Sequence, residues 1–392
     1  MNKLFHLEIS NNRIFGLDLL RFVAIFMVLL GHSLILAPEN LKPYVYQFIY
    51  DGVAIFFVLS GFLIGGILIK ILNKENPSYK GLLDFWKRRW MRTLPAYFLV
   101  LIFLIFYTLI FLPKNFPEGW FRFFFFTQNF LGHYRPEFFA EAWSISVEEW
   151  FYLLVPLILF SILIFFKTTI KLTMLFISLI IILLVTWYRF HLYYSFNIPN
   201  NPNPDQLIYF KETLINLRIR YQVIPRLDSI MYGVLGAFLA HYTPKIWNNK
   251  LNVFLFFIGL YILYNTKLNI GKTYAPFAVI WYPSIISMAI FMMLPFLSNM
   301  RKGLGKWTSW ITFFSLISYS MYLVNLNVVT IAIIKHTIHG DYSLDKFIPD
   351  DYWVLDYILF WVLTIFISFI LYKFIEVPFM KMRDKKKIVQ DN

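Results

Sequence analysis

The 392-residue sequence contains no cysteine, and only 15% of its residues are charged. Without cysteine the chain has no disulfide, no thiolate nucleophile, no cysteine-ligated metal and no S-acylated anchor. A soluble domain typically has about 25% charged residues, so the low charge excludes an ordinary soluble protein. The sequence also lacks the G-x-S-x-G, H-E-x-x-H, P-loop and G-x-G-x-x-G motifs that mark several common classes of enzyme.

Long apolar segments dominate the sequence instead, and 59% of its residues are hydrophobic. Apolar segments of about 20 residues are typical of membrane-spanning helices. We predict an all-α integral membrane protein of about ten transmembrane helices, forming a single membrane domain over residues 1–392. The predicted spans are 16–37, 48–72, 93–112, 143–166, 170–190, 226–243, 251–265, 275–298, 310–334 and 353–375. The seventh is the weakest because it is short for a full crossing.

Basic residues set the expected orientation. The formal net charge is +14, and much of the excess lies beside the spans, in the connection around residues 70–92 and in the tail at 376–392. Ten spans place both stretches on the side of the N-terminus, which the positive-inside rule makes cytoplasmic. We therefore expect lipid headgroups, and not nucleic acid, to be the partner of this charge. Residues 121–130 are predicted to lie in the interface or re-enter, and 199–206 to form a turn-rich loop.

The first span carries a polar stripe on an apolar helix. Arg21 and His32 are 11 residues apart, so steps of about 100° return them to one face, roughly 16 Å apart along the axis. Asp18 lies on nearly the same face and can pair with Arg21. A lone histidine on an apolar helix is more often a core residue. The aligned charges favour a functional histidine here, because neutral imidazole can take a proton from an alcohol.

Two further segments combine packing features with candidate ligands. In the second span, Gly61, Gly65 and Gly66 favour close helix packing, and Ser60 reads as a buried hydroxyl. Before the third span, Arg88, Arg89 and Arg92 precede Pro95, which is expected near the first turn of that helix. The arginines read equally well as topology determinants or as a site for a phosphate-rich ligand.

Later spans contain the remaining candidates. Glu148 and Glu149 lie in the fourth span and project about 100° apart, so only one of them can face a site. Arg226 and Asp228 open the sixth span, either as a helix start or as site residues. Tyr322 in the ninth span, and Glu376 with Pro378 at the end of the tenth, read on their own as interface anchors and a helix stop.

Taken in order, these segments resemble the acyltransferase 3 family of bacterial multispanning membrane proteins, whose best-known members O-acetylate cell-surface glycans. The matching positions are Arg21 and His32, Phe56–Ile64, Arg88, Arg89, Arg92 and Pro95, Trp143–Tyr152, Arg226, Asp228 and Gly233, Ser318–Asn325, and Glu376 with Pro378. Asn325 stands where the family commonly has histidine, which weakens any mechanism that needs two histidines. Some relatives carry a fused extracytoplasmic SGNH hydrolase-like domain, and we expect none here.

The resemblance implies an acyltransferase 3-like bundle in the bacterial inner membrane that moves an acyl group, most simply acetyl, from acetyl-CoA to a carbohydrate hydroxyl. The acceptor would be a lipopolysaccharide, another polysaccharide, peptidoglycan, a secreted glycoside or a lipid-linked saccharide. The implied roles are His32 as general base, Glu148 as the residue that orients its imidazole, and Arg21, Arg88, Arg89 and Arg92 as CoA-binding residues. The implied pocket residues are Asp18, Ser60, Glu149, Arg226, Asp228 and Tyr322. No metal is expected, because a thioester is already activated.

A second hypothesis is a transporter or flippase for a lipid-linked glycan, with Asp18, Arg21 and His32 as a proton relay. The sequence shows neither inverted repeats nor paired broken helices, which counts against it. A third is a different membrane O-acyltransferase fold with a buried histidine, which the ordered motifs disfavour. Transfer of an intact lipid would separate the transporter from the enzyme.

Overall fold

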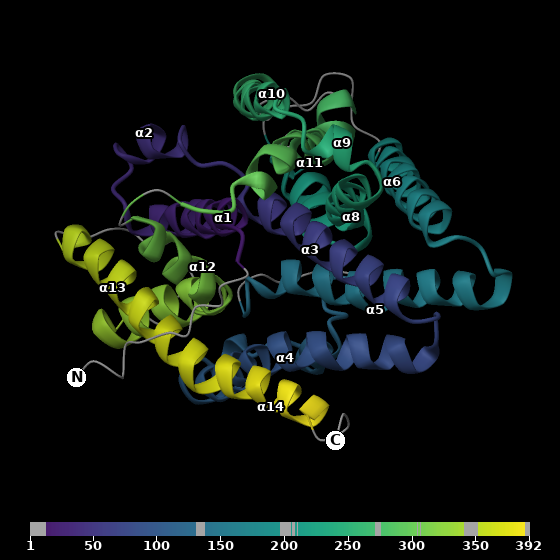
Figure 1. Cartoon of the computed structure of the whole chain (residues 1–392). Helices are drawn as coiled ribbons and strands as arrows, with labels where there is room; N and C mark the ends of the chain where they lie inside the picture. The colour runs from purple at the N-terminus through teal and green to yellow at the C-terminus, as the bar shows by residue number, and fades with distance from the viewer. Residues whose placement is uncertain are drawn as a thin grey trace.

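The structure is a computed structural model that describes residues 13–130, 138–196, 211–270, 276–303, 307–340 and 352–388, with isolated residues 205, 208, 209 and 305. Every regular element in these residues is helical. Eight helices are long and apolar enough to cross a membrane, and a bent pair makes a ninth candidate span. The predicted all-α membrane fold is therefore confirmed (Figure 1).

The candidate spans fall into two groups. The eight continuous ones are α1 (Phe15–Ser33), α3 (Gly52–Lys74), α4 (Tyr79–Phe111), α5 (Ala142–Phe166), α6 (Ile170–Ser195), α11 (Pro276–Asn299), α12 (Trp307–Val324) continuing into the π-helix η7 (Asn325–Ile338), and α13 (Trp353–Leu371) continuing into η8 (Tyr372–Glu376). The bent pair consists of η4 (Lys211–Arg220) and, after a 79° bend, η5 (Ile224–Arg226) with α8 (Leu227–Tyr242). The shorter elements are η1 (Leu34–Leu36), α2 (Lys42–Tyr46), η2 (Pro113–Asn115), η3 (Trp120–Phe125), α9 (Pro244–Trp247), α10 (Asn252–Asn265), η6 (Thr266–Ile270) and α14 (Val377–Ile388).

The ten predicted spans correspond to these eight helices, the bent pair and α10. As expected for the weakest span, α10 has only 14 residues. The largest boundary error concerns α4, which begins at Tyr79 and has 33 residues, or about 50 Å of helix. Ser78 caps it by accepting a hydrogen bond from the Gly81 N–H at 3.2 Å. The basic segment is thus part of the helix, and Pro95 lies inside it and not near its first turn.

Two segments, residues 121–130 and 199–206, were predicted not to cross the membrane. Within residues 121–130 the chain forms the short 3-10 helix η3, whose Phe123 is buried. The Tyr97 hydroxyl donates a hydrogen bond to the Phe123 carbonyl at 2.9 Å, which fixes the segment against α4. Residues 199–204 and 206 of the predicted turn-rich loop lie outside the described residues.

Backbone contact between α3 and α8 holds the centre of the bundle together. A Cβ added at Gly61 would lie 1.9 Å from the Ile230 carbonyl oxygen, and one at Gly233 would lie 2.0 Å from that of Val58. Only glycine permits this approach. Gly66 has open space around it, so its predicted packing role is wrong.

A fully buried ion pair joins α6, α8 and α11. Arg189 donates from Nη2 to Asp228 Oδ2 at 2.7 Å, and both side chains are 0% exposed. The Ser284 hydroxyl donates to the same carboxylate at 2.7 Å. Asp228 was a candidate pocket residue, but it lines neither of the two polar cavities described below. Its contacts are those of a structural residue.

Candidate functional site

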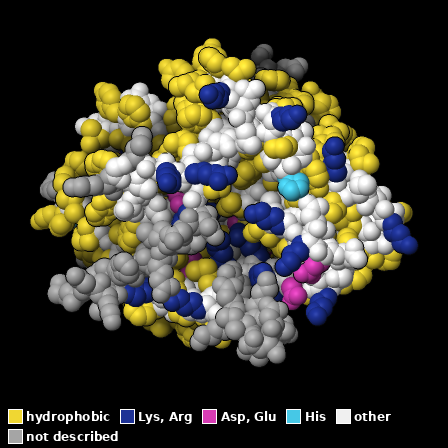
Figure 2. All heavy atoms as spheres, in the orientation of Figure 1, with side chains coloured by type: hydrophobic (Ala, Val, Ile, Leu, Met, Phe, Trp, Pro, Cys, Tyr) yellow, Lys and Arg dark blue, Asp and Glu magenta, His cyan; other side chains and the backbone are white. Residues whose placement is uncertain are grey.

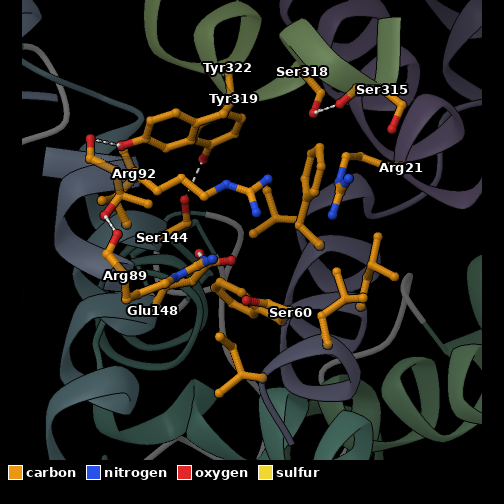
Figure 3. A pocket seen from close by; sticks show the side chains of 18 of the residues that line it. Arg21, Ser60, Arg89, Arg92, Ser144, Glu148, Ser315, Ser318, Tyr319 and Tyr322 are labelled. Carbon is orange, nitrogen blue, oxygen red and sulfur yellow. Dashed lines mark hydrogen bonds and ion pairs between the residues drawn. The ribbon is translucent and has the colours of Figure 1, made fainter. Parts of the chain in front are cut away.

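The first polar cavity is lined by residues of α1, α3, α4, α5, α12 and η8, and includes the guanidinium groups of Arg21, Arg89 and Arg92. We call it the arginine cavity. Figure 2 shows basic side chains gathered in a hollow near the middle of one face. Figure 3 shows Arg21 and Arg92 reaching into the cavity from facing walls. Several like charges around one space favour an anionic ligand.

Tyr152 joins three of the cavity's polar residues. Its hydroxyl donates to Glu148 Oε2 at 2.7 Å and also contacts the Arg89 guanidinium and the Ser60 hydroxyl. Because the single hydroxyl proton goes to Glu148, Tyr152 accepts from both Arg89 and Ser60. Arg89 also forms an ion pair with Glu148 at 3.6 Å. The charge of Arg89 is therefore largely compensated within the protein.

Arg21 and Arg92 differ from Arg89 in this respect. Arg21 Nη1 lies 4.0 Å from Asp18 Oδ1, which is a weak version of the predicted pair. Asp18 is held mainly by Arg13, which donates from Nε at 2.8 Å, and by the Ser315 hydroxyl at 2.8 Å. Arg92 makes no ion pair with any carboxylate in the described part of the chain. These two guanidiniums are the ones free to bind an anion.

His32 lines a second, roomier cavity of about 420 Å³, against about 130 Å³ for the first. We call it the histidine cavity. Its charged residues are Asp51, Arg220, Arg226 and Lys267, and Arg226 Nη2 lies 3.5 Å from Asp51 Oδ2. Helix α3 divides the two spaces, since its Val53 and Phe56 line the arginine cavity and its Ile55 the histidine cavity. Arg21 and His32 share a helix but face different cavities.

Asn325 fixes the tautomer of His32. Its amide nitrogen donates to the carbonyls of Met321 and Tyr322, at 3.0 and 2.8 Å. Its Oδ1 therefore points to His32 Nδ1, 2.5 Å away. An amide oxygen only accepts, so Nδ1 carries the proton and the lone pair is on Nε2. Glu148, which was expected to orient the imidazole, lies in the arginine cavity with Arg89 and Tyr152, and the residue in contact with the imidazole is Asn325.

Glu141, which sequence reasoning missed, positions the segment that carries Asn325. The π-helix η7 begins at Asn325, and the backbone N–H of Leu326 donates to Glu141 Oε1 at 3.0 Å. Burial raises the pKa of the Glu141 carboxyl to about 8. Three residues after Glu141, Ser144 Oγ shares a hydrogen bond of 2.6 Å with the Tyr322 hydroxyl. The only sequence signal for Glu141 is its position directly before the Trp143–Tyr152 motif.

The remaining candidates are divided between the site and its surroundings. Ser60, Glu148 and Tyr322 line the arginine cavity, and Arg226 lines the histidine cavity. Glu149 points away and accepts a hydrogen bond from the Thr93 hydroxyl at 3.0 Å. Glu148 and Glu149 differ in this way because successive residues of a helix such as α5 project about 100° apart.

The positions of Arg88 and Glu376 differ from those predicted from the sequence. Arg88 is exposed and does not line the arginine cavity. Glu376 is buried, lines that cavity and accepts a hydrogen bond from Ser320, so its interpretation as an interface anchor is wrong. Pro378 does not stop the helix either, because α14 continues to Ile388 after the π turn of η8. The described residues contain no group of three or more His, Asp or Glu side chains that could hold a metal ion.

A family model described as an acyltransferase domain matches residues 14–373, which include every lining residue of both cavities except Glu376. The chain belongs to this acyltransferase family. The family resemblance of the ordered motifs is thereby confirmed. The acyltransferase domain thus carries both cavities, with His32 in one and the arginine cluster in the other.

Curated relatives of this acyltransferase-family chain are named as O-acetyltransferases. O-acetyltransferase OatA of Staphylococcus aureus is 31% identical over 159 residues, which cover 37% of this chain and 24% of the relative. Peptidoglycan O-acetyltransferase OatA of Listeria monocytogenes is 36% identical over 120 residues, covering 27% and 19%. Another Staphylococcus aureus protein is 26% identical over 396 residues, covering 93% and 57%. The matched part thus spans about a quarter or less of the first two relatives. No solved structure matches the chain.

Proposed function

We propose that the chain is a membrane O-acyltransferase that moves an acetyl group from acetyl-CoA to a hydroxyl of a cell-envelope or secreted carbohydrate. Family membership and the names of the relatives support the reaction class. One observation carries the proposal: His32, with Nε2 unprotonated, lines a roomy cavity on the same helix as Arg21 of the arginine cavity. That arrangement supplies a base and an anion-binding site on opposite sides of α3.

The arginine cavity fits the donor. Coenzyme A is a polyanion, and Arg21 and Arg92 are the cavity guanidiniums without a close carboxylate. In our proposal these two hold its phosphates, while Arg89, with Glu148 and Tyr152, shapes the wall. Helix α14 packs against α4, which brings the basic tail to the helix that carries the basic cluster. This supports the bacterial inner membrane as the location, with both termini and the arginine cavity on the cytoplasmic side.

The chemistry follows from the tautomer of His32. Nε2 takes the proton of the acceptor hydroxyl while the hydroxyl oxygen attacks the thioester carbonyl carbon. The C–S bond then breaks, the acetyl group becomes an ester of the acceptor, and the imidazolium returns its proton to the thiolate sulfur of CoA. General base catalysis of this kind is worth roughly 10²–10⁴-fold. Because α3 lies between the cavities, transfer requires the side chains that separate them, such as Phe56, to move.

The test is acetyl transfer from radiolabelled acetyl-CoA in membranes that contain the native chain, His32→Ala or His241→Ala, at matched expression. His241 is exposed and lines neither cavity, so it is the control. We expect label in the carbohydrate fraction with the native chain and the control, and a loss of about 100-fold or more with His32→Ala. Equal labelling by all three would remove His32 from the mechanism. Abundant protein with no labelling at all, together with transfer of an intact lipid in vesicles, would favour the transporter.

A further inference from the structure

An apolar groove adjoins the histidine cavity. It runs between α1, α10 and α11, and its lining includes Leu19 and Met27 of α1, Leu260 and Tyr264 of α10, and Met293 of α11. Four other lining residues, Tyr50, Ile55, Leu263 and Ile290, also line the histidine cavity. The two spaces therefore lie side by side, separated only by the side chains of these shared residues.

The groove lies at the outer surface of the bundle. Leu260 and Tyr264 of α10 are 40% and 54% exposed, and in Figure 1 α10 stands at the edge of the molecule. Both α1 and α10 pack against α11, which forms the floor between them. From Leu19 to Met27 the groove follows α1 for about 12 Å. Its complement is an apolar chain that enters from the membrane.

Basic side chains line the histidine cavity, and one of them, Lys267, lies next to the groove. Lys267 follows Leu263 by one helical turn, lines the histidine cavity and lies 5.0 Å from the centre of the Tyr50 ring. Arg220 lines the same cavity and is exposed. Neither forms an ion pair with a carboxylate of the described residues, whereas the nearby Arg226 is paired with Asp51. The histidine cavity beside the groove thus carries positive charge that suits an anionic linker such as a phosphate.

We propose that the acceptor is a lipid-linked saccharide, in which an apolar chain is joined through a phosphate to the sugar that carries the reacting hydroxyl. The chain lies in the groove, the phosphate at Lys267 and Arg220, and the sugar in the histidine cavity beside His32. This inference rests on the proposed function and names its substrate class. It explains why a groove lined by apolar groups adjoins a polar cavity that contains the candidate base.

The binding test uses a photoreactive polyprenyl phosphate as the probe, with the purified full chain in phosphatidylcholine nanodiscs. We expect crosslinks to peptides of α1 or α10, and competition by unlabelled polyprenyl phosphate but not by polyprenol or phosphatidylglycerol. Lys267→Gln should lower labelling about tenfold, and Lys267→Arg should restore it. Met27→Trp should fill the groove and abolish labelling, whereas Phe257→Trp, on an exposed position of α10 outside the groove, should not. Thermal unfolding of each variant confirms that it is folded.

Equal competition by phosphatidylglycerol would mean that the groove holds bulk lipid, and absent labelling would mean that it holds no such ligand. Either result overturns the inference. A second measurement separates this failure from that of the proposed function. Label from acetyl-CoA should enter saccharide lipid extractable in organic solvent, and Met27→Trp should prevent this. Label that enters only water-soluble carbohydrate, unaffected by Met27→Trp, would overturn the lipid-linked acceptor and leave the acyltransferase intact.

Discussion

At the scale of single residues, Asn325 controls the chemistry available to His32, because its Oδ1 accepts a hydrogen bond from His32 Nδ1 and leaves the lone pair on Nε2. The motif order identified Asn325 as the position where the family commonly has histidine, so its location near a site was predictable. Its function depends on the direction of its amide, which is set by the carbonyls of Met321 and Tyr322. Both carbonyls belong to the last turn of α12, which ends directly before the π-helix η7 begins at Asn325. The family resemblance implied the orienting role for Glu148, and spacing alone could not correct it, because spacing does not say which span a side chain approaches.

Removing the amide of Asn325 should impair the base without affecting the donor. Asn325→Leu leaves His32 Nδ1 without its acceptor, so both tautomers become populated, and we expect turnover to fall about 10- to 100-fold. KM for acetyl-CoA should stay constant, because Asn325 does not line the arginine cavity. Asn325→Asp keeps an acceptor oxygen and should recover much of the rate, with an altered pH profile. Full activity of the leucine variant would show that the contact does not set the tautomer.

The neutral form of Glu141 makes stability depend on pH. Its pKa is about 8 in the folded chain against 4.5 for an ordinary glutamate. Between these two pH values the folded chain keeps a proton on Glu141 that the unfolded chain has lost. The free energy of unfolding therefore falls as the pH rises through this range. The contribution is fully present below pH 4.5 and is lost as the pH rises to about 8, at about 1.4 kcal/mol per unit.

Glu141→Gln should remove this pH dependence, because the amide stays neutral and its oxygen can still accept from the Leu326 N–H. We expect the variant to melt at a higher temperature than the native chain at pH 8.5 and at a similar temperature at pH 5. Thermal unfolding in detergent measures both. Glu141→Ala, which loses the contact, should be less stable at both values, and parallel curves for the native chain and Glu141→Gln would contradict the assignment.

At the scale of helices, the length of each apolar segment predicted which segments form spans. Local features of the sequence predicted the helix boundaries and the packing glycines less well. The short α10 was recognisable from its length, but the start of α4 was not, because the charged segment before residue 93 looked like a loop. A helix capped by Ser78 continues through that segment and needs no apolar face where it leaves the membrane. Glycines show the same limit. Gly61 and Gly66 look alike in sequence, and only the position of α8 distinguishes them.

The glycine pair offers a matched test of the crossing of α3 and α8. Gly61→Ala places a methyl group 1.9 Å from the Ile230 carbonyl oxygen, so the helices must separate. We expect a loss of about 2 kcal/mol or more, since overpacking typically costs 1–3 kcal/mol, and poor recovery of folded protein. Gly66→Ala meets nothing within 4 Å and should be neutral or slightly stabilising. Monodispersity and thermal unfolding of the two purified variants measure the difference, and equal behaviour would mean that this crossing adapts easily.

At the scale of the whole molecule, two cavities with different contents share the helices α1 and α3. The arginine cavity is small and lined by three arginines, whereas the histidine cavity is larger, contains His32 and adjoins an apolar groove. The sequence placed Arg21 and His32 on one helix and one side of it. That they face separate spaces depends on α3, whose neighbouring residues Ile55 and Phe56 line opposite cavities. This arrangement allows the acyl donor to bind on one side of α3 and the acceptor to bind on the other.

The arginines of α4 test this division, because they differ in position and not in charge. Arg92 lines the cavity without an ion-pair partner among the described residues, whereas Arg88 is exposed outside it. Arg92→Gln should raise KM for acetyl-CoA about tenfold or more, as expected for a lost hydrogen bond to a charged group, with a smaller effect on turnover. Arg88→Gln removes the same charge from the same helix and should leave KM unchanged. Equal increases would mean that CoA responds to the general basic surface, and no increase for either would place the donor outside the arginine cavity. A selective effect of Arg92, with the acceptor dependence unaltered, would assign the donor to the arginine cavity and leave the histidine cavity to the acceptor.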